Sequence, residues 1–276
     1  MMKKDFVSIM KVGVLVLLVM LLCYVPGCKK STDEESPSNT EHPSASEHPS
    51  GSEHPTGSEH PTAKTPTETP TEKSTEPAEM VAIEIKLPKP MFVGTPQSTK
   101  VPNLEKPLGK PRPPFLAPAG TTNVALGKPI ASSDEEPIIG EIEMITDGDM
   151  EAADGSYVEL GPFTQHVTVD LEAMHNIYAI IVWHYHKQAR VYYDVLIQVA
   201  DDPDFITNVR TLFNNDHDNS SGLGVGEDLH YTETNEGKLI NAKGVKARYV
   251  RLYSNGNTGN DLNHYIEVAV YGKPAQ

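Results

Sequence analysis

Proline divides this chain into two parts that cannot fold in the same way. Of its 23 prolines, 18 fall in residues 1–120 and five in residues 121–276. Proline lacks a backbone N–H and is excluded from helix interiors and central strands, so the first part is unsuited to regular packing. The second part holds ten of the eleven tyrosines and the single tryptophan, Trp183. The sequence therefore predicts one folded domain at residues 120–276, preceded by segments without a core of their own.

Charge is also unevenly distributed. Residues 1–120 carry 13 Lys+Arg against 14 Asp+Glu, whereas residues 121–276 carry 10 against 24, a net charge of −14. Such an acidic domain repels phosphate, which argues against a nucleic-acid partner. Neutral ligands and cations remain compatible with this charge.

The first 27 residues have the pattern of an export signal. Lysines at positions 3, 4 and 11 precede an uncharged apolar run at residues 12–25, which is shorter than a membrane span. The run ends in Val25-Pro26-Gly27-Cys28, which resembles a bacterial lipobox. The resemblance implies cleavage after Gly27 and lipidation of Cys28, and so a domain anchored in the cell envelope, at the outer membrane if the host is Gram-negative. The alternative is an uncleaved anchor.

Residues 28–79 have the composition of a disordered linker. A Glu-His-Pro-Ser/Thr unit begins at positions 41, 47, 53 and 59, and a Thr/Pro/Glu-rich stretch follows it. Such a sequence buries too little apolar surface to fold, which indicates a spacer. Weak chelation of a metal by the four repeat histidines is the alternative. Residues 80–119 are Pro-rich with few aromatics and are interpreted as an extended strap along the domain, or as more linker.

The sequence of the folded region predicts an all-β structure. Short runs rich in β-branched and aromatic residues occur at 164–171, 177–185, 191–200, 248–253 and 265–271, separated by polar turns. The run at 177–185 is apolar on both faces and is predicted to be a central strand. Only residues 150–153 and 171–175 have a pattern that permits a turn of helix. A two-sheet β-sandwich is the predicted fold class.

Five motifs in this region, in order, resemble the discoidin domain, also called the coagulation factor five/eight C-type domain. The resemblance implies a jelly roll of the galactose-binding-like class, to which many bacterial carbohydrate-binding modules belong. Two departures are the absence of cysteine for a terminal disulfide once Cys28 is lipidated, and Ser156-Tyr157-Val158 where a tryptophan often follows the second motif. The motifs are NVALGKP at 123–129, ITDGD at 145–149, VTVDL at 167–171, ARYVRLY at 247–253 and IEVAVYG at 266–272.

The same resemblance implies a structural calcium ion. In similar modules it lies beside the loop of the second motif and a glutamate of the last strand, which correspond here to Asp147, Asp149 and Glu267. Calcium prefers six to eight oxygen ligands, and two carboxylates flanking a glycine supply some of them. An ordinary Asp-Gly turn without metal is the alternative interpretation.

Ligand binding is predicted at the polar loops of one end of the sandwich. Asn, Asp and His side chains hydrogen-bond sugar hydroxyls, while an aromatic ring covers the apolar face of a pyranose. The predicted contacts are Trp183, His184, Tyr185, His186, Arg190, Tyr192, Asn215, Asp216, His217, Asn255, Asn257, Asn260 and His264.

His184 and His186 also permit a second interpretation. On a strand they share one face, and two such histidines hold zinc or copper when His264, His217 or Asp194 is a third ligand. Catalytic motifs for a serine nucleophile, a zinc protease or a phosphate loop are absent from the sequence, so an enzyme is not expected.

The sequence as a whole predicts a lipid-anchored, non-catalytic binding module for a carbohydrate or similar polyhydroxyl ligand. The alternatives are a structural or adhesion module that binds another envelope protein and, less in keeping with the motifs, a small enzyme.

Overall fold

The structure is a computed structural model, which describes residues 79–92 and 99–276. All of the described residues belong to one compact unit, residues 70–276. The predicted signal peptide, Cys28 and nearly all of the predicted linker therefore lie outside the described residues. Within the described ranges, no helix has the length and apolar character needed to cross a membrane.

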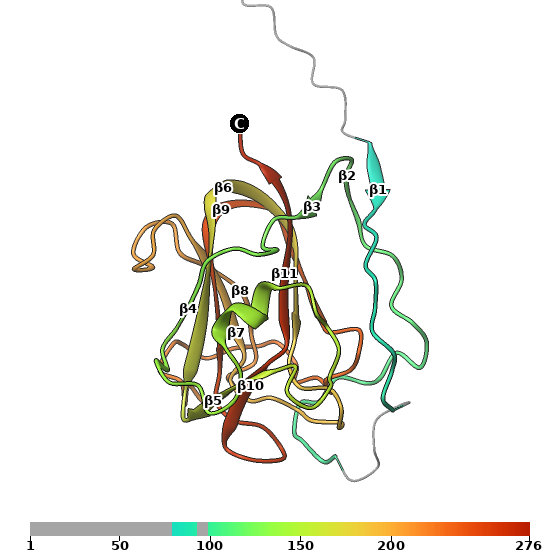
Figure 1. Ribbon diagram of the computed structural model, residues 1–276, viewed down its shortest axis with the longest axis vertical. Coiled ribbons are helices and arrows are strands. Elements are labelled where there is room, and N and C mark those ends of the chain that lie inside the picture. Colours follow the sequence, from blue (N-terminus) through green and yellow to red (C-terminus); the bar gives the residue numbers. More distant parts are fainter. Residues whose placement is uncertain (1–78, 93–98) are drawn as a thin grey trace, which may run out of the picture. The chain divides into compact units, whose positions relative to one another are not determined.

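The described chain is all-β except for one short 3₁₀ helix (Figure 1). This confirms the predicted fold class. In chain order the elements are β1 (Met80–Ala82), β2 (Leu116–Pro118), β3 (Thr122–Asn123), β4 (Ile130–Ser132), η1 (Ile142–Thr146), β5 (Val158–Pro162), β6 (Gln165–Trp183), β7 (Leu196–Ala200), β8 (Arg210–Asn214), β9 (Lys238–Ser254), β10 (Leu262–Tyr265) and β11 (Glu267–Pro274).

The two longest strands, β6 and β9, run through both layers of the sandwich. Seven strands form one antiparallel sheet in the order β3-β11-β6-β9-β7-β8, with β4 also paired to β6. Residues 165–170 of β6 pair with β4 and with the end of β9, which in turn pairs with β7. Residues 175–183 pair with β11 and with the start of β9. The sheet therefore folds over itself where these two strands arch (Figure 1).

The arch has a local backbone cause. The β6–β9 register shifts between Asp170 and His175, and Glu172 there has φ of +63°. Arg248 of β9 binds both carboxylate oxygens of Asp170, at 2.7 and 2.8 Å, which fixes the bend. The sequence permitted a turn of helix at residues 171–175, but this segment is a bulged strand. No helix forms at residues 150–153 either, and the only helix of the described chain is η1.

The main core lies between the two layers. It is formed by inward-facing aliphatic side chains such as Val167 and Leu252 of one layer and Ile180, Val182 and Val268 of the other. Alternation along β6 sends Ile181 and Trp183 to the opposite face, where they join a second cluster. This explains why the run at 177–185 is apolar on both faces, and confirms that it belongs to a central strand, flanked by β9 and β11.

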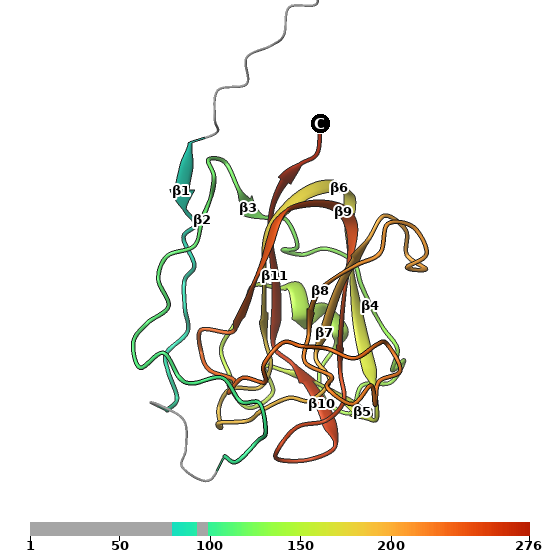
Figure 2. The same ribbon diagram turned by 180° about the vertical axis from the view of Figure 1, so that it is seen from behind.

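The Pro-rich strap packs on the outer face of the β6–β11 layer. Ile83 and Ala117 are buried against Ala179 of β6, and β1 pairs with β2. Arg112 donates to the carbonyls of Gly237 and Glu236 at 2.9 and 3.0 Å. Figure 2 shows the strap running along the side of the sandwich from β1 to the end where β5 and β10 lie, and back to β2. It is thus part of the folded unit.

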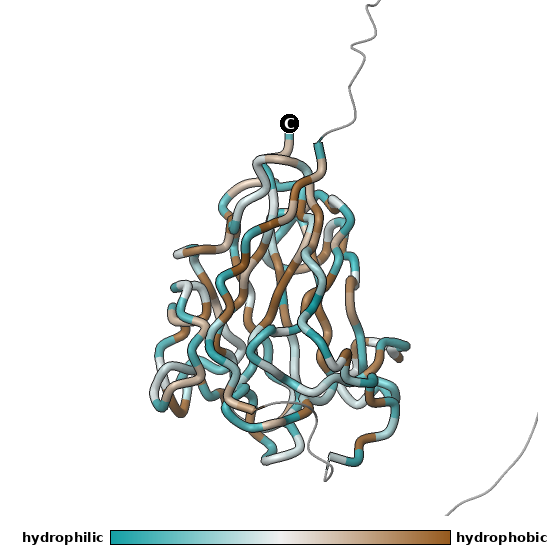
Figure 3. Tube along the Cα trace, turned by 90° about the vertical axis from the view of Figure 1, so that its right-hand side faces the viewer, coloured by the Kyte–Doolittle hydropathy of each residue, from teal (hydrophilic) through white to brown (hydrophobic). Residues whose placement is uncertain are grey.

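Hydropathy separates the strands from the loop end. Figure 3 shows apolar segments along the central strands, whereas the loops at the end opposite the C-terminus are mostly hydrophilic. The apolar strands enclose the core, and the polar loops at this end lie outside it, where binding residues are commonly found.

Candidate functional site

The polar loops that follow β6, β8 and β9 meet at this end of the sandwich. Tyr193 exchanges backbone hydrogen bonds with the β9–β10 loop, accepting from Asn255 N–H at 2.9 Å and donating to the carbonyl of Gly256 at 3.1 Å. The backbone N–H of Asn215, after β8, donates to Val195 at 3.1 Å. Residues more than 60 positions apart in the chain are therefore held side by side.

Between these loops and the strap lies a groove with a volume of about 380 Å³. One wall is the strap at residues 101–103, and the parallel bridge between Leu104 and His230 fixes it there. The opposite wall and floor carry aromatic, amide, imidazole and carboxylate groups. The lining residues are Val101, Pro102, Asn103, Tyr193, Asp194, His217, Asp218, Ser220, His230 and Asn255.

Asp194 joins the loops that form the groove. It is 7% exposed, and its Oδ2 accepts from Ser220 Oγ at 2.7 Å and from Asn255 Nδ2 at 2.8 Å. Its backbone has φ of +49°, in the left-handed region that aspartate and asparagine adopt more readily than other residues with a side chain.

Two histidines, His217 and His230, give the groove hydrogen-bonding groups. Burial, together with the nearby His217, lowers the pKa of His230, while the charge of Asp194 opposes the shift. The His230 ring therefore stays neutral at pH 7. It meets the ring of His217 edge-on at 5.0 Å and that of Tyr193 at 5.7 Å. A neutral imidazole both donates and accepts, which suits a hydroxyl-rich ligand.

The predicted aromatic contacts Trp183 and Tyr192 are corrected by their burial. Both rings are fully buried, so neither forms a platform for a ligand in this structure. Trp183 donates through Nε1 to the carbonyl of Asn235 at 2.9 Å. The groove instead receives Tyr193, because the positive φ of Asp194 interrupts strand alternation and turns Tyr192 toward the core.

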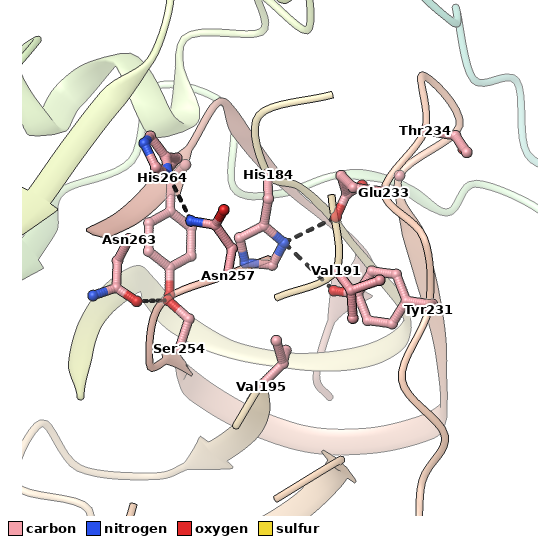
Figure 4. Close-up of polar contacts among 12 residues, drawn as sticks. His184, Val191, Val195, Tyr231, Glu233, Thr234, Ser254, Asn257, Asn263 and His264 are labelled. Carbon is pink, nitrogen blue, oxygen red and sulfur yellow. Dashed lines mark hydrogen bonds and ion pairs between the residues drawn. The ribbon is translucent and has the colours of Figure 1, made fainter. Parts of the chain in front are cut away.

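His184 belongs to a buried polar network (Figure 4). Its Nδ1 donates to Glu233 Oε2 at 3.0 Å, with Tyr231 OH 3.4 Å away, and its ring stacks on Tyr192 at 4.3 Å. His186, also buried, donates to the carbonyl of Met150 at 2.9 Å.

The alternative zinc or copper site on the histidine pair gains no support from the structure. In the described part of the chain, neither His184 nor His186 belongs to a group of three potential ligands. One ring nitrogen of each forms a hydrogen bond within the fold, and the other, His184 Nε2 or His186 Nδ1, has no partner.

Three predicted asparagine contacts serve the loops themselves. Asn257 donates to Asn260 Oδ1 and to the carbonyl of Leu262, both at 2.8 Å. Asn215 is fully buried and accepts from Val195 N–H at 2.7 Å. Only Asn255 of the predicted asparagines lines the groove.

Asp216 is also fully buried, although it was predicted to contact a ligand directly. Its carboxylate accepts from the backbone N–H groups of Ser220 and Ser221, at 3.1 and 3.0 Å. These bonds shape the loop that carries His217 and Asp218 to the groove.

Arg190, Tyr185 and His264 do come together, but none of them lines the groove. The Arg190 guanidinium lies 4.9 Å from the centre of the Tyr185 ring, and His264 donates to Glu159 at 2.9 Å. Burial, then the nearby charge of Arg190, lowers the pKa of His264 to about 3, so its ring is neutral. A second hollow of about 340 Å³, lined by Ala189 and Thr258 among others, shares Val101 and Tyr193 with the groove.

The structure brings the loop that carries Asp147 and Asp149 against Glu267 of the last strand, although the three carboxylates do not all lie within 4.8 Å of one another. Glu267 is 1% exposed and accepts through Oε2 from Gly148 N–H, while its Oε1 has no hydrogen-bond partner. Burial, then the charges of Asp147 and Asp149, raises the pKa of Glu267 to about 8. An orphaned buried carboxylate oxygen beside two exposed carboxylates fits a hard cation.

A different set of carboxylates forms a group of three potential metal ligands in the described chain. The carboxylates of Asp194, Asp216 and Asp218 each place an oxygen within 4.8 Å of the other two. Of these, Asp194 and Asp218 line the groove. The sequence predicted Asp216 only as a ligand contact, and Asp194 only as an alternative metal ligand.

No protein-family profile matches the chain, and no curated protein matches it. Among solved structures it is similar to the CBM32 of AlyQ in complex with 4,5-unsaturated mannuronic acid, with 19% identity, a TM-score of 0.38 and coverage of 51% of this chain and 92% of that one. It is similar as well to CpGH89CBM32-4 of Clostridium perfringens, in complex with GlcNAc-α-1,4-galactose, with 15% identity and a TM-score of 0.41. That match covers 56% of this chain and 96% of the other.

It is also similar to a family 89 glycoside hydrolase from Clostridium perfringens in complex with PUGNAc, with 17% identity and a TM-score of 0.39. That match covers 55% of this chain and only 15% of the hydrolase. The function of this chain is therefore inferred from its own residues.

Proposed function

We propose that the domain is a non-catalytic binding module that holds a carbohydrate or similar polyhydroxyl ligand in the groove between the strap and the loops. The observation that carries this proposal is the lining of the groove. Tyr193 offers a ring face, and Asn255, His217 and His230 offer polar groups around it. Sugars combine an apolar ring face with hydroxyls that both donate and accept, and this combination of side chains matches them.

The size and charge of the groove narrow the ligand class. A volume of about 380 Å³ lies within the range of small-molecule sites. The carboxylates of Asp194 and Asp218 repel anions, so neutral or amino sugars are favoured over acidic ones. Carboxylates also accept hydrogen bonds from sugar hydroxyls with more strength than neutral acceptors do.

A glycan array with residues 70–276, the compact unit, tests the proposal. We expect binding to a subset of glycans, and a loss of affinity of at least tenfold in Tyr193→Ala with little change in melting temperature. Phe163→Ala is the matched control, because Phe163 is 79% exposed and does not line the groove. Uniformly flat binding across the array, or equal loss in both variants, contradicts the proposal.

Anchoring in the cell envelope forms part of the same proposal. What supports it is the sequence of residues 1–28, with its basic start, apolar run and Cys28. A lipid on Cys28 with residues 29–78 as a spacer would present the groove away from the membrane. Cys28→Ser is expected to abolish lipid labelling and leave an unprocessed or soluble precursor; normal cleavage and membrane fractionation of that variant would contradict it.

A structural calcium ion at Asp147, Asp149 and Glu267 completes the proposed function. The partnerless Glu267 Oε1 and the two neighbouring carboxylates support it. The ion would join the loop after η1 to the last strand and neutralise part of the acidic charge of the domain.

A further inference from the structure

The carboxylate cluster at the groove is assembled from two separate segments. Asp194 precedes β7, and Asp216 and Asp218 follow β8. Asp194 is 7% exposed and Asp216 is fully buried, whereas Asp218 is exposed. With oxygens within 4.8 Å of one another, the three carboxylates occupy a space of the size that one cation fills.

No charged group in residues 79–92 and 99–276 compensates this cluster. None of the three carboxylates forms an ion pair with Lys, Arg or His, and the donors that reach them are neutral. Ser220 Oγ and Asn255 donate to Asp194, and Ser221 donates to Asp216. Neutral donors satisfy lone pairs but bring no positive charge to the cluster, which a divalent cation would supply.

The spacing of the loop adds a second indication. Asp216, Asp218 and Ser220 alternate along the chain, and Glu227 stands at the twelfth position counted from Asp216. Oxygen donors at the first, third and fifth positions recur in calcium-binding loops, whereas Glu227 is exposed and lies outside the carboxylate group in the structure. Ser221 replaces the glycine usual at the sixth position, and the positive φ of Asn219, at +61°, contributes to the turn instead.

An independent observation comes from His230. This side chain is 8% exposed, lines the same groove as Asp194 and Asp218, and its Nδ1 has no hydrogen-bond partner. The Nε2 of the adjacent His217 also lacks one. Buried polar nitrogens without partners are unfavourable, and their presence at a site points to a bound molecule. Water held by a cation at the carboxylates would supply hydrogen bonds to both rings.

We propose that Asp194, Asp216 and Asp218 bind a calcium ion at the edge of the groove. Three carboxylates and a serine hydroxyl form an oxygen set, which favours calcium over zinc or copper. The ion would lie between two of the groove-lining residues, so a hydroxyl of a bound ligand would be able to replace one of its waters. This last step, ligand binding that depends on calcium, rests on the proposed function, whereas the ion itself does not.

Calorimetric titration with calcium alone tests the ion. The protein used is residues 70–276 with Glu267→Gln, which removes the heat of calcium binding at the candidate site of Asp147, Asp149 and Glu267. If the Glu267→Gln variant does not fold, Asp149→Asn is used in its place. We expect one remaining site, with an affinity weakened at least tenfold by Asp218→Asn. Asp218 is exposed and the substitution preserves its shape, so the fold should be retained, which the melting temperature checks.

Asp202→Asn is the matched control. Asp202 also accepts backbone N–H bonds in its own loop, from Ile206 and Thr207, but it is not part of the cluster. Its substitution should leave calcium affinity unchanged. Absence of calcium binding in the Glu267→Gln protein, or equal affinity with and without Asp218→Asn, overturns the proposal.

The coupling to ligand is tested separately, with a glycan that the array has identified. We expect its binding to weaken at least tenfold in EDTA and in Asp218→Asn. If calcium binds but the glycan affinity is unchanged in EDTA, the calcium site is supported and the coupling of calcium to ligand binding is wrong. If the array identifies no glycan, the proposed function has failed, and the calorimetric titration still tests the calcium site.

Discussion

Glu267 of β11 accepts a hydrogen bond from the backbone N–H of Gly148, 119 positions earlier in the chain, at 3.1 Å. The glutamate is 1% exposed, and this is the bond that ties the loop after η1 to the last strand. Its other carboxylate oxygen has no partner. A buried carboxyl with one satisfied oxygen, beside Asp147 and Asp149, holds its proton more tightly than a free one.

The pH dependence of stability should reveal this glutamate. Burial, with the nearby aspartates, raises the pKa of Glu267 from 4.5 to about 8. The folded state therefore binds more protons than the unfolded state between these values, and its stability falls as pH rises through the window, by at most about 1.4 kcal/mol per pH unit. In EDTA, Glu267→Gln should lose this slope and be the more stable protein at pH 8.

Urea unfolding of both proteins at several pH values between 4.5 and 8 measures the effect. Subtracting the unfolding free energy of the variant from that of the wild type at each pH cancels the contribution of groups that the substitution does not affect. Parallel curves would show that Glu267 titrates normally.

Calcium should stabilise the domain through the same residues. A ligand that binds only the folded state at a hundred times its dissociation constant adds about 2.7 kcal/mol, a melting shift of about 5–10 °C for a domain of this size. Because calcium competes with the proton on Glu267, the shift should be larger at pH 8 than at pH 6. Differential scanning fluorimetry with calcium, magnesium and EDTA measures it.

Two calcium sites are proposed, so the rise in melting temperature on adding calcium has two contributions. Asp218→Asn should remove one of them, and Asp147→Ala should remove the other without loss of the fold. Magnesium should substitute poorly, because its octahedral geometry is stricter than that of calcium. A melting curve that EDTA and Asp147→Ala leave unchanged would mean that the loop after η1 is only a turn.

The sandwich could be predicted because its strands carry local signals. Alternation and β-branched residues marked the runs that became β6, β7, β9 and β11. The bend between the halves of β6 carried no such signal. It depends on Glu172 at positive φ and on the pairing of Asp170 with Arg248, a contact that only the folded chain forms.

The site was predicted less completely, for two physical reasons. One residue at positive φ, Asp194, exchanges the directions of Tyr192 and Tyr193, and strand alternation cannot anticipate it. His230 and the strap at residues 101–103 reach the groove through a long-range bridge that no local pattern encodes. The alternating oxygens of Asp216, Asp218 and Ser220 were visible in the sequence, and their spacing was the signal that could have found the cluster.

Arg112 should be a main attachment point of the strap. Its guanidinium donates to two carbonyls of the loop before β9, at 2.9 and 3.0 Å, and its backbone N–H donates to the Glu236 carboxylate at 3.1 Å. Arg112→Ala should cost about 2 kcal/mol of unfolding free energy, because charged hydrogen bonds are lost and carbonyls are left unsatisfied.

Hydrogen exchange of residues 79–92 and 99–118 measures the attachment, and exchange there should accelerate in Arg112→Ala. Lys110→Ala is the control, since Lys110 is exposed and makes no ion pair with any described residue. Equal exchange in the two variants would show that the apolar contacts of Ile83 and Ala117 hold the strap without Arg112.

Gly237 should tolerate no side chain. It has φ of +63°, and a Cβ there would lie 2.8 Å from Cε2 and Nε1 of Trp183 and from the carbonyl oxygen of Val182. Gly155 has φ of +90°, and a Cβ added there would meet nothing within 4 Å, so this position carries the backbone strain alone. Gly155→Ala is therefore expected to cost about 1 kcal/mol and Gly237→Ala about 3 kcal/mol, since the second adds overpacking to the strain. Trp183 is the only tryptophan, so its fluorescence should shift in Gly237→Ala and not in Gly155→Ala. Equal costs in urea unfolding, with unchanged Trp183 emission in both, would show that the loop before β9 moves away from the ring without penalty.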